Sequence, residues 1–158
     1  MSNPRDVPYE TTHLIRDACL CLHVQRAARA LSRLFDEALR PVGLTSGQFS
    51  LLNALNRPAP PSIAPVAQLL AMDRTTLTAA LKPLERDGLV AIARDPEDRR
   101  NRLLRLTDKG REVLASAVPI WRDVHGAIEN GMVEIAPDAL REALKGLSRP
   151  TPTGTVRG

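Results

Sequence analysis

MDRTTLTAALKPLERDGLV, residues 72–90, is the stretch that decides the fold of this chain. Its leucines recur at the spacing of one helical face, and they are Leu77, Leu81 and Leu84. Asp73 stands before this pattern in the position of an N-cap, and Gly88 follows it in the position of a left-handed C-terminal residue. We therefore predict a helix over residues 74–87.

A shorter helix is predicted just before it, over residues 64–71, with Pro65 in the first turn, where proline is well tolerated. Two short helices joined by a tight turn are typical of a helix-turn-helix. Pro83 lies inside the second helix and removes one backbone hydrogen bond, so it is expected to kink or loosen that helix.

DPEDRRNRLLRLT, residues 95–107, follows the second helix and contains the densest run of arginines in the chain. Short strand-like runs at 89–94 and 102–107 flank its charged centre, which predicts a β-hairpin with arginines at the tip. A helix-turn-helix followed by such a hairpin is a winged helix-turn-helix, with the hairpin as the wing. We expect Asp98 to hold the wing in shape by pairing with Arg94 or Arg100.

This arrangement fits the chemistry of duplex DNA. Small hydroxyl and methyl groups can approach base edges in the major groove, and arginine can pair bidentately with guanine. A narrow minor groove is strongly negative and attracts inserted arginines. The expected DNA contacts are Arg74, Thr75, Thr76, Thr78 and Lys82 on the second helix, and Arg99, Arg100 and Arg102 on the wing.

Helical patterns flank the winged part on both sides. One long helix is predicted over residues 12–40, with an apolar stripe formed by Leu20, Val24, Ala27, Leu31, Leu34 and Ala38. Thr45 and Gln48 form a capping-box pattern at the start of the next helix. Thr107 is placed to cap a helix over 108–130, and Pro137 starts a last helix that ends near Leu147.

Composition narrows the function classes. The chain has 158 residues, a net charge of +4 and a pI of about 9.7, which favours anionic partners. Aromatic residues make up only 3%, and a small domain of this kind often completes its core by dimerisation. The sequence contains neither a membrane-spanning apolar run nor a signal-peptide core, so a cytoplasmic location and no membrane partner are expected.

Four stretches together resemble the MarR family of bacterial transcriptional regulators. They are LTSGQFSLL (44–52), MDRTTLTAALKPLERDGLV (72–90), the wing DPEDRRNRLLRLT (95–107) and LTDKGRE (106–112). Asp98 and Arg100 match the D-x-R signature of the family's wing. In this family the turn of the helix-turn-helix usually contains glycine, and Ala71 stands there in this chain.

The resemblance implies a mainly α-helical fold with a small β-hairpin wing. It further implies dimerisation helices at 12–43 and 108–147 around a winged helix-turn-helix at 44–107. From their own composition, residues 1–11, with two prolines and little periodicity, are expected to be a flexible arm, and residues 148–158 a disordered tail. Such a protein would be a homodimer that binds a pseudo-palindromic operator in double-stranded DNA, usually as a repressor released by a small ligand or by cysteine oxidation.

The resemblance also places an effector pocket where the flanking helices meet the winged part. Aromatic carboxylates and phenols are frequent ligands there, because an arginine can pair with a carboxylate and an aromatic ring can stack. The residues expected to line this pocket are Cys21, Gln25, Arg29, Phe49, Leu52, Trp121 and Arg122.

Three roles are open for the cysteine pair in CLCLH (19–23). Each cysteine can be a small buried apolar side chain. Aligned by the run RALSR (29–33), Cys21 falls at the sensing position of MarR proteins that respond to organic hydroperoxides, although Tyr9 is the chain's only tyrosine. Metal binding by Cys19 and His23 is the third role, but two ligands do not complete a zinc site.

Other function classes find little support in the sequence. A glycine-rich phosphate loop, a catalytic triad signature and a metal-ligand set are all missing from the motifs, so no enzymatic activity and no cofactor are expected. A winged helix that binds protein rather than DNA is the remaining alternative. Such modules usually lack a basic wing and a polar recognition face.

Overall fold

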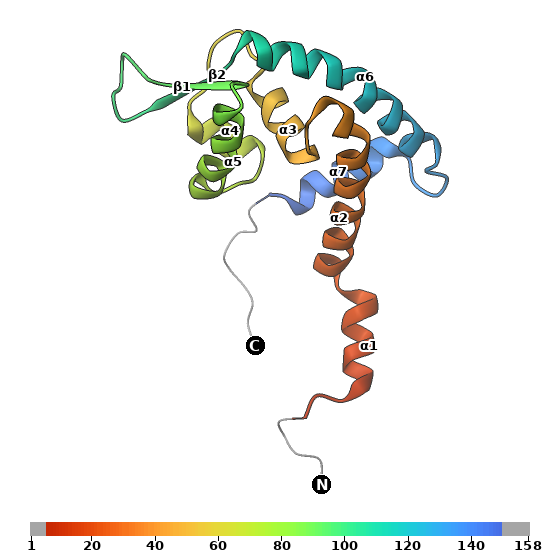
Figure 1. Cartoon of the computed structure of the whole chain (residues 1–158). Coiled ribbons are helices and arrows are strands. Elements are labelled where there is room, and N and C mark those ends of the chain that lie inside the picture. The colour runs from red at the N-terminus through yellow and green to blue at the C-terminus, as the bar shows by residue number, and fades with distance from the viewer. Residues whose placement is uncertain (1–5, 150–158) are drawn as a thin grey trace.

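A computed structural model of the chain describes residues 6–149 (Figure 1). It is mainly helical with one two-stranded antiparallel hairpin, which confirms the predicted fold class. The flanking helices are α1 (Tyr9–Ala18), α2 (Leu20–Leu39), the 3-10 turn η1 (Arg40–Val42), α6 (Asp108–Asn130) and α7 (Pro137–Leu147). Between them lie α3 (Ser46–Leu55), α4 (Ile63–Leu69), α5 (Arg74–Arg86), β1 (Val90–Arg94) and β2 (Arg102–Leu106).

The prediction of one long helix over residues 12–40 is wrong in one respect, because Cys19 divides this segment into two helices. The backbone of Cys19 is extended, with φ −73° and ψ 105°, and its Sγ accepts a 3.5 Å hydrogen bond from the N–H of Leu22. Cys19 therefore ends α1 and caps α2. Helix α1 begins at Tyr9, so the last residues of the expected 1–11 arm are helical; residues 1–5 and 150–158 lie outside the described residues.

Side-chain caps begin helices α3, α5 and α6 at the residues that the sequence predicts. Thr45 and Gln48 form the complete capping box of α3, with Thr45 Oγ1 accepting from Gln48 N at 3.2 Å and Gln48 Oε1 accepting from Thr45 N at 3.0 Å. Asp73 accepts from Thr76 N at 2.8 Å to cap α5. Thr107 accepts from Gly110 N at 3.0 Å to cap α6. These bonds satisfy N–H groups that a helix start leaves without partners.

The core is built mostly of leucine and lies in the winged part of the chain. Fully buried members include Leu51 and Leu52 of α3, Leu77, Leu81 and Leu84 of α5, and Leu104 and Leu106 of β2. Helix α2 contributes only Leu39 to the buried set, while α1 and α7 contribute none. The apolar stripe predicted on α2 is therefore largely open on a single chain, and α1 extends away from the body (Figure 1).

The turn between α4 and α5 contains an unusual backbone conformation. Ala71 has φ 51°, which is the left-handed region that a side chain with a Cβ adopts at a cost of roughly 1–2 kcal/mol. Glycine would avoid this cost, so the replacement noted in the sequence leaves the turn strained. Pro83 lies inside α5, which continues in helical conformation through Arg86.

Helix α6 meets the start of the wing at Gly110, where two backbones approach closely. A Cβ on Gly110 would lie 2.0 Å from the carbonyl oxygen of Leu89, which real contacts do not allow. Thr107 closes the same junction, because its N–H donates to Leu89 O at 3.1 Å and its hydroxyl donates to Gly88 O at 2.6 Å. Gly88 itself has φ 73°, as its predicted place after α5 requires.

Replacing Gly110 by alanine should lower the free energy of unfolding by about 1–3 kcal/mol, because the added methyl group meets backbone that cannot rotate away. Chemical denaturation followed by circular dichroism would measure this loss.

Gly47→Ala is the matched control. The nearest atom to a Cβ on Gly47 is Thr45 Oγ1 at 4.0 Å, so this variant should be as stable as the parent or slightly more stable. Equal stability of Gly110→Ala and the parent would show that α6 can shift away from the wing.

Candidate nucleic-acid interface

Helix α5 presents one polar face to solvent, opposite the leucines that enter the core. Arg74, Thr75, Thr78, Ala79 and Lys82 line a shallow depression of about 300 Å³ on this face. Each of these side chains is exposed, whereas Leu77 and Leu81 are buried. The structure thus brings together four of the five DNA contacts expected on this helix.

The end of the wing loop and the first residue of β2 border a notch with the start of α5. This notch of about 170 Å³ is lined by Arg74 and Thr78 of α5, by Ile63 and Ala64 of α4, and by Arg100, Asn101 and Arg102 of the wing. Three guanidinium groups from segments more than 25 residues apart in the sequence therefore border one concave surface. A site of this kind suits phosphate, because arginine binds phosphate oxygens through charge-assisted hydrogen bonds.

Two of the threonines expected at the interface also bond within α5. Thr76 Oγ1 donates to Asp73 Oδ2 at 2.6 Å, and this bond is the largest cause that lowers the pKa of Asp73 below its ordinary value. Thr76 therefore supports the cap of the helix. Thr78 Oγ1 donates to the carbonyl of Arg74 at 2.7 Å, which leaves its lone pairs and methyl group facing outward.

The acids of the wing shape its tip through backbone groups. Asp98 Oδ1 accepts from the N–H of Arg100 at 3.0 Å, and Asp98 Oδ2 accepts from the amide of Asn101 at 3.2 Å. Asp95 N donates to Asn101 O at 3.1 Å and closes the loop. Asn101 thus holds the wing loop and also lines the notch; the sequence prediction omits it, although asparagine three residues after Asp98 is typical of a turn.

The predicted ion pair between Asp98 and Arg94 or Arg100 is wrong. No ion pair among residues 6–149 joins Asp98 to an arginine. The register of the hairpin instead sets Arg94 opposite Arg102, and Asp98 bonds to Arg100 through the main chain. Arg94, Arg99, Arg100 and Arg102 are all exposed along the wing.

The residues expected to form an effector pocket fall into three places. Phe49, Trp121 and Arg122 line a cavity of about 460 Å³ together with Ser50, Asn53, Ala54, Leu69, Leu70 and Val118; this space is called the ring cavity below. The rings of Phe49 and Trp121 are stacked, with centroids 6.3 Å apart. Its walls come from α3, α6 and the end of α4, so it adjoins the helix-turn-helix.

The other members of that set do not line the ring cavity. Leu52 is fully buried in the core, as a residue on the inner face of α3 must be. On the outside of α2, Gln25 Nε2 lies 3.2 Å from Cys21 Sγ, and Arg29 donates to Gln25 Oε1 at 3.3 Å. Cys21 is exposed, whereas Cys19 is half-buried.

Residues 6–149 contain neither a metal-ligand cluster nor a membrane-spanning helix. This part of the chain gathers no group of three or more His, Cys, Asp or Glu side chains able to hold a metal ion. None of its helices combines the length and the apolar character needed to cross a bilayer.

Comparison with known proteins agrees with the geometry of α5 and the wing. The MarR family profile matches residues 42–101. The solved DNA complex of the transcriptional regulator MosR from Mycobacterium tuberculosis has 36% sequence identity and a TM-score of 0.76, over 82% of this chain and 93% of that one. The chain belongs to the MarR family. MarR proteins are DNA-binding transcriptional regulators rather than enzymes.

Two further MarR relatives are informative. The repressor CouR, bound to a 23-mer DNA duplex, has 32% identity and a TM-score of 0.74 over 85% of this chain and 96% of that one; CouR comes from Rhodococcus jostii. The transcriptional activatory protein BadR of Rhodopseudomonas palustris is 36% identical over 97 residues, which are 60% of this chain. The match spans only 55% of the length of BadR.

Replacing Arg100 by alanine should weaken DNA binding on all sequences and reduce the slope of log affinity against log salt by about one phosphate contact, roughly 0.9. Thr78→Val keeps the shape of the side chain and removes its hydroxyl, so it should change sequence preference more than overall affinity. Fluorescence anisotropy at several salt concentrations would measure both effects.

Arg40→Ala is the control for charge alone, because Arg40 is exposed on η1 and pairs with Glu37 far from α5 in the sequence. An unchanged affinity and salt slope for Arg100→Ala would contradict the wing model. A loss for Arg40→Ala as large as that for Arg100→Ala would do the same.

Proposed function

We propose that this chain is a sequence-specific regulator that binds double-stranded DNA as a homodimer, mostly as a repressor, and that a small ligand lowers its affinity for the operator. The observation that carries this proposal is the basic notch between α5 and the wing, lined by Arg74, Arg100 and Arg102. The polar face of α5 would read base edges in the major groove. Operator binding would place the protein in the cytoplasm.

Dimerisation is supported by apolar surface that a single chain leaves open. On α1 and α2 the exposed apolar side chains include Leu14, Ile15, Leu20, Val24, Leu31 and Leu34. Val133, Ile135 and Leu147 are exposed near or on α7. Large exposed apolar patches are rare on monomeric proteins, and a second copy packed on these helices would cover these side chains.

A ligand of the aromatic carboxylate or phenol class is supported by the ring cavity. Its volume of about 460 Å³ lies in the range of small-molecule sites. Trp121 and Phe49 offer faces for stacking, and Arg122 offers a guanidinium for a carboxylate. Among structural relatives, CouR has been crystallised with p-coumaroyl-CoA, and DNA binding by BpsR of Bordetella bronchiseptica is regulated by 6-hydroxynicotinic acid.

Oxidant sensing through Cys21 is a second candidate function. Cys21 is exposed, and the amide of Gln25 points at its sulfur from one turn away. Thiol oxidation depends on access, which Cys21 has and Cys19, as a half-buried cap, has less. Tyr9 lies against His13 in α1, so its hydroxyl belongs to a different helix from Cys21.

Selection of bound fragments from the source genome should recover an inverted repeat, because a two-fold dimer presents two α5 helices to successive major grooves. Leu31→Glu puts a charge into the open stripe of α2 and should give a monomer in sedimentation velocity that no longer protects the whole repeat. Arg26→Glu, on the opposite face of α2, should stay dimeric. Recovery of no shared sequence would contradict an operator-specific regulator.

Cys21→Ser should keep operator binding, because the side chain lies on α2, outside the residues that line the notch and the face of α5. Under the ligand proposal, peroxide leaves both the parent and this variant on DNA in a gel-shift titration. If peroxide released the parent but not Cys21→Ser from DNA, Cys21 would be the sensor, and oxidant sensing would replace ligand binding as the favoured hypothesis.

A further inference from the structure

The chain leaves helix α5 through Asp87, Gly88 and Leu89, and the carbonyl group of each of these residues accepts a hydrogen bond from the start of α6. Lys109 Nζ donates to Asp87 O at 2.8 Å. The hydroxyl of Thr107 donates to Gly88 O at 2.6 Å, and its backbone N–H donates to Leu89 O at 3.1 Å. Two residues at the start of α6 thus supply donors to carbonyl groups that the end of α5 leaves without partners.

Among these three bonds, the one from Lys109 brings a positive charge to the end of α5. A cation at this end of a helix interacts favourably with the helix dipole and commonly bonds to the last carbonyl groups. Arg86 stands in the last turn of α5, but its guanidinium pairs with the carboxylate of Asp87 at 3.1 Å. The cation that reaches the carbonyl of Asp87 therefore comes from α6, 22 residues later in the chain.

Pro83 makes this support from outside the helix more important. Proline has no N–H, so residue 83 cannot donate to the carbonyl of Ala79, and α5 lacks one bond of its own ladder before its last turn. Thr78 and Lys82, which face DNA in the proposed function, lie just before this gap. The direction of a helix is set by where its two ends are held, and α6 holds the C-terminal end of α5.

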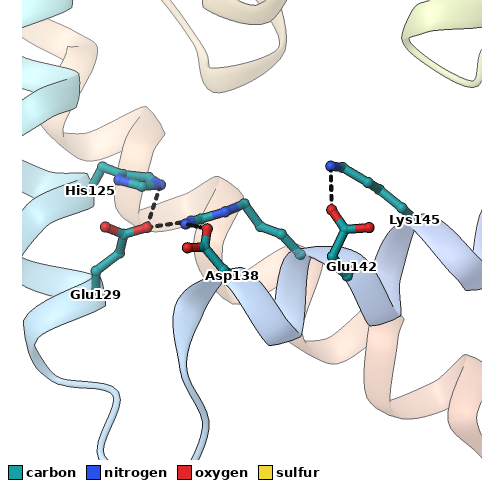
Figure 2. A network of polar contacts seen from close by, with 6 residues as sticks. His125, Glu129, Asp138, Glu142 and Lys145 are labelled. Atoms are coloured by element: carbon teal, nitrogen blue, oxygen red, sulfur yellow. Dashed lines mark hydrogen bonds and ion pairs between the residues drawn. The ribbon is translucent and has the colours of Figure 1, made fainter.

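Helix α6 is suited to this support because it is anchored elsewhere in the fold. Leu114 and Ala117, in its first half, are buried in the core. Near its far end, Glu129 pairs with Arg141 of α7 and lies 3.7 Å from the Nε2 of His125 (Figure 2). The bonds to the end of α5 therefore start from a helix whose own position is fixed by the core and by α7.

We propose that Lys109 is a positioning residue for sequence-specific DNA recognition, which holds the end of α5 at the angle where its polar face meets the base edges of an operator. This inference rests on the proposed function, because it gives a role in reading DNA to a residue outside the notch and the face of α5. Base contacts depend on precise geometry in a groove, whereas phosphate contacts depend mainly on charge. Loss of the Lys109 bond therefore lowers affinity for an operator more than affinity for other DNA.

Lys109→Met removes the donor and nearly keeps the length of the side chain. We expect it to weaken binding to the inverted repeat recovered from the genome by about fivefold or more, and to leave the salt slope and binding to a scrambled duplex unchanged. Lys109→Arg keeps a charged donor and should bind as the parent does. Arg111→Met removes the same charge two residues further along α6 and should also match the parent. Fluorescence anisotropy with both duplexes would measure these affinities.

Hydrogen exchange followed by mass spectrometry tests the same bond without DNA. Peptides that cover residues 83–90 should exchange faster in Lys109→Met than in the parent, because the end of α5 loses its tie to α6. The same peptides should exchange at the parent's rate in Lys109→Arg and Arg111→Met.

Other results would overturn the proposal. These are parent-like operator binding or parent-like exchange by Lys109→Met, an equal loss on both duplexes, or failure of Lys109→Arg to bind as the parent does. A salt slope smaller by roughly 0.9 for Lys109→Met would make Lys109 a phosphate contact instead. If the parent bound the repeat and the scrambled duplex equally, the proposed function itself would fail. If the parent and Lys109→Met preferred the repeat to the same degree, only the role of Lys109 would fail.

Discussion

The contact between Gly110 and the carbonyl of Leu89 is the constraint on which the arrangement of the two halves depends. It fixes where α6 leaves the wing, and Thr107 strengthens it by bonding to Gly88 and Leu89. Helix α6 then supplies Trp121 to the ring cavity and Glu129 to the ion pair with α7. One close backbone approach thus sets the geometry of the DNA-reading surface relative to the cavity and to the expected dimer helices.

The winged part could be predicted because its signals are local. Thr45, Asp73 and Thr107 each cap a helix within three residues of their own position, and such bonds depend little on the rest of the fold. The leucine spacing of α5 identifies the buried face, and the polar face follows from it. The backbone at position 88 is left-handed, and a glycine directly after the helical pattern of α5 predicts this conformation.

Features that depend on tertiary structure were harder to predict. The break at Cys19 preserves the apolar spacing on both sides, so periodicity shows one helix where there are two. The sequence predicts that Leu52 and Arg29 line one pocket. In the structure Leu52 lies in the core, and Arg29 lies on the exposed surface of α2. The concave surface between α7 and the turn from α4 to α5 joins residues some 75 positions apart in the chain, and no local sequence pattern predicts this contact.

The cross-strand position of Arg94 and Arg102 has a consequence for how the wing responds to its surroundings. Like charges directly opposite each other on a hairpin repel, so at low ionic strength the free wing is least stable at the end of its strands next to the loop. Added salt screens this repulsion and firms the unbound hairpin, while the same ions compete with DNA for its arginines. In the complex, DNA phosphates take the place of salt ions beside these arginines. Added salt therefore stabilises the free hairpin but weakens the complex with DNA.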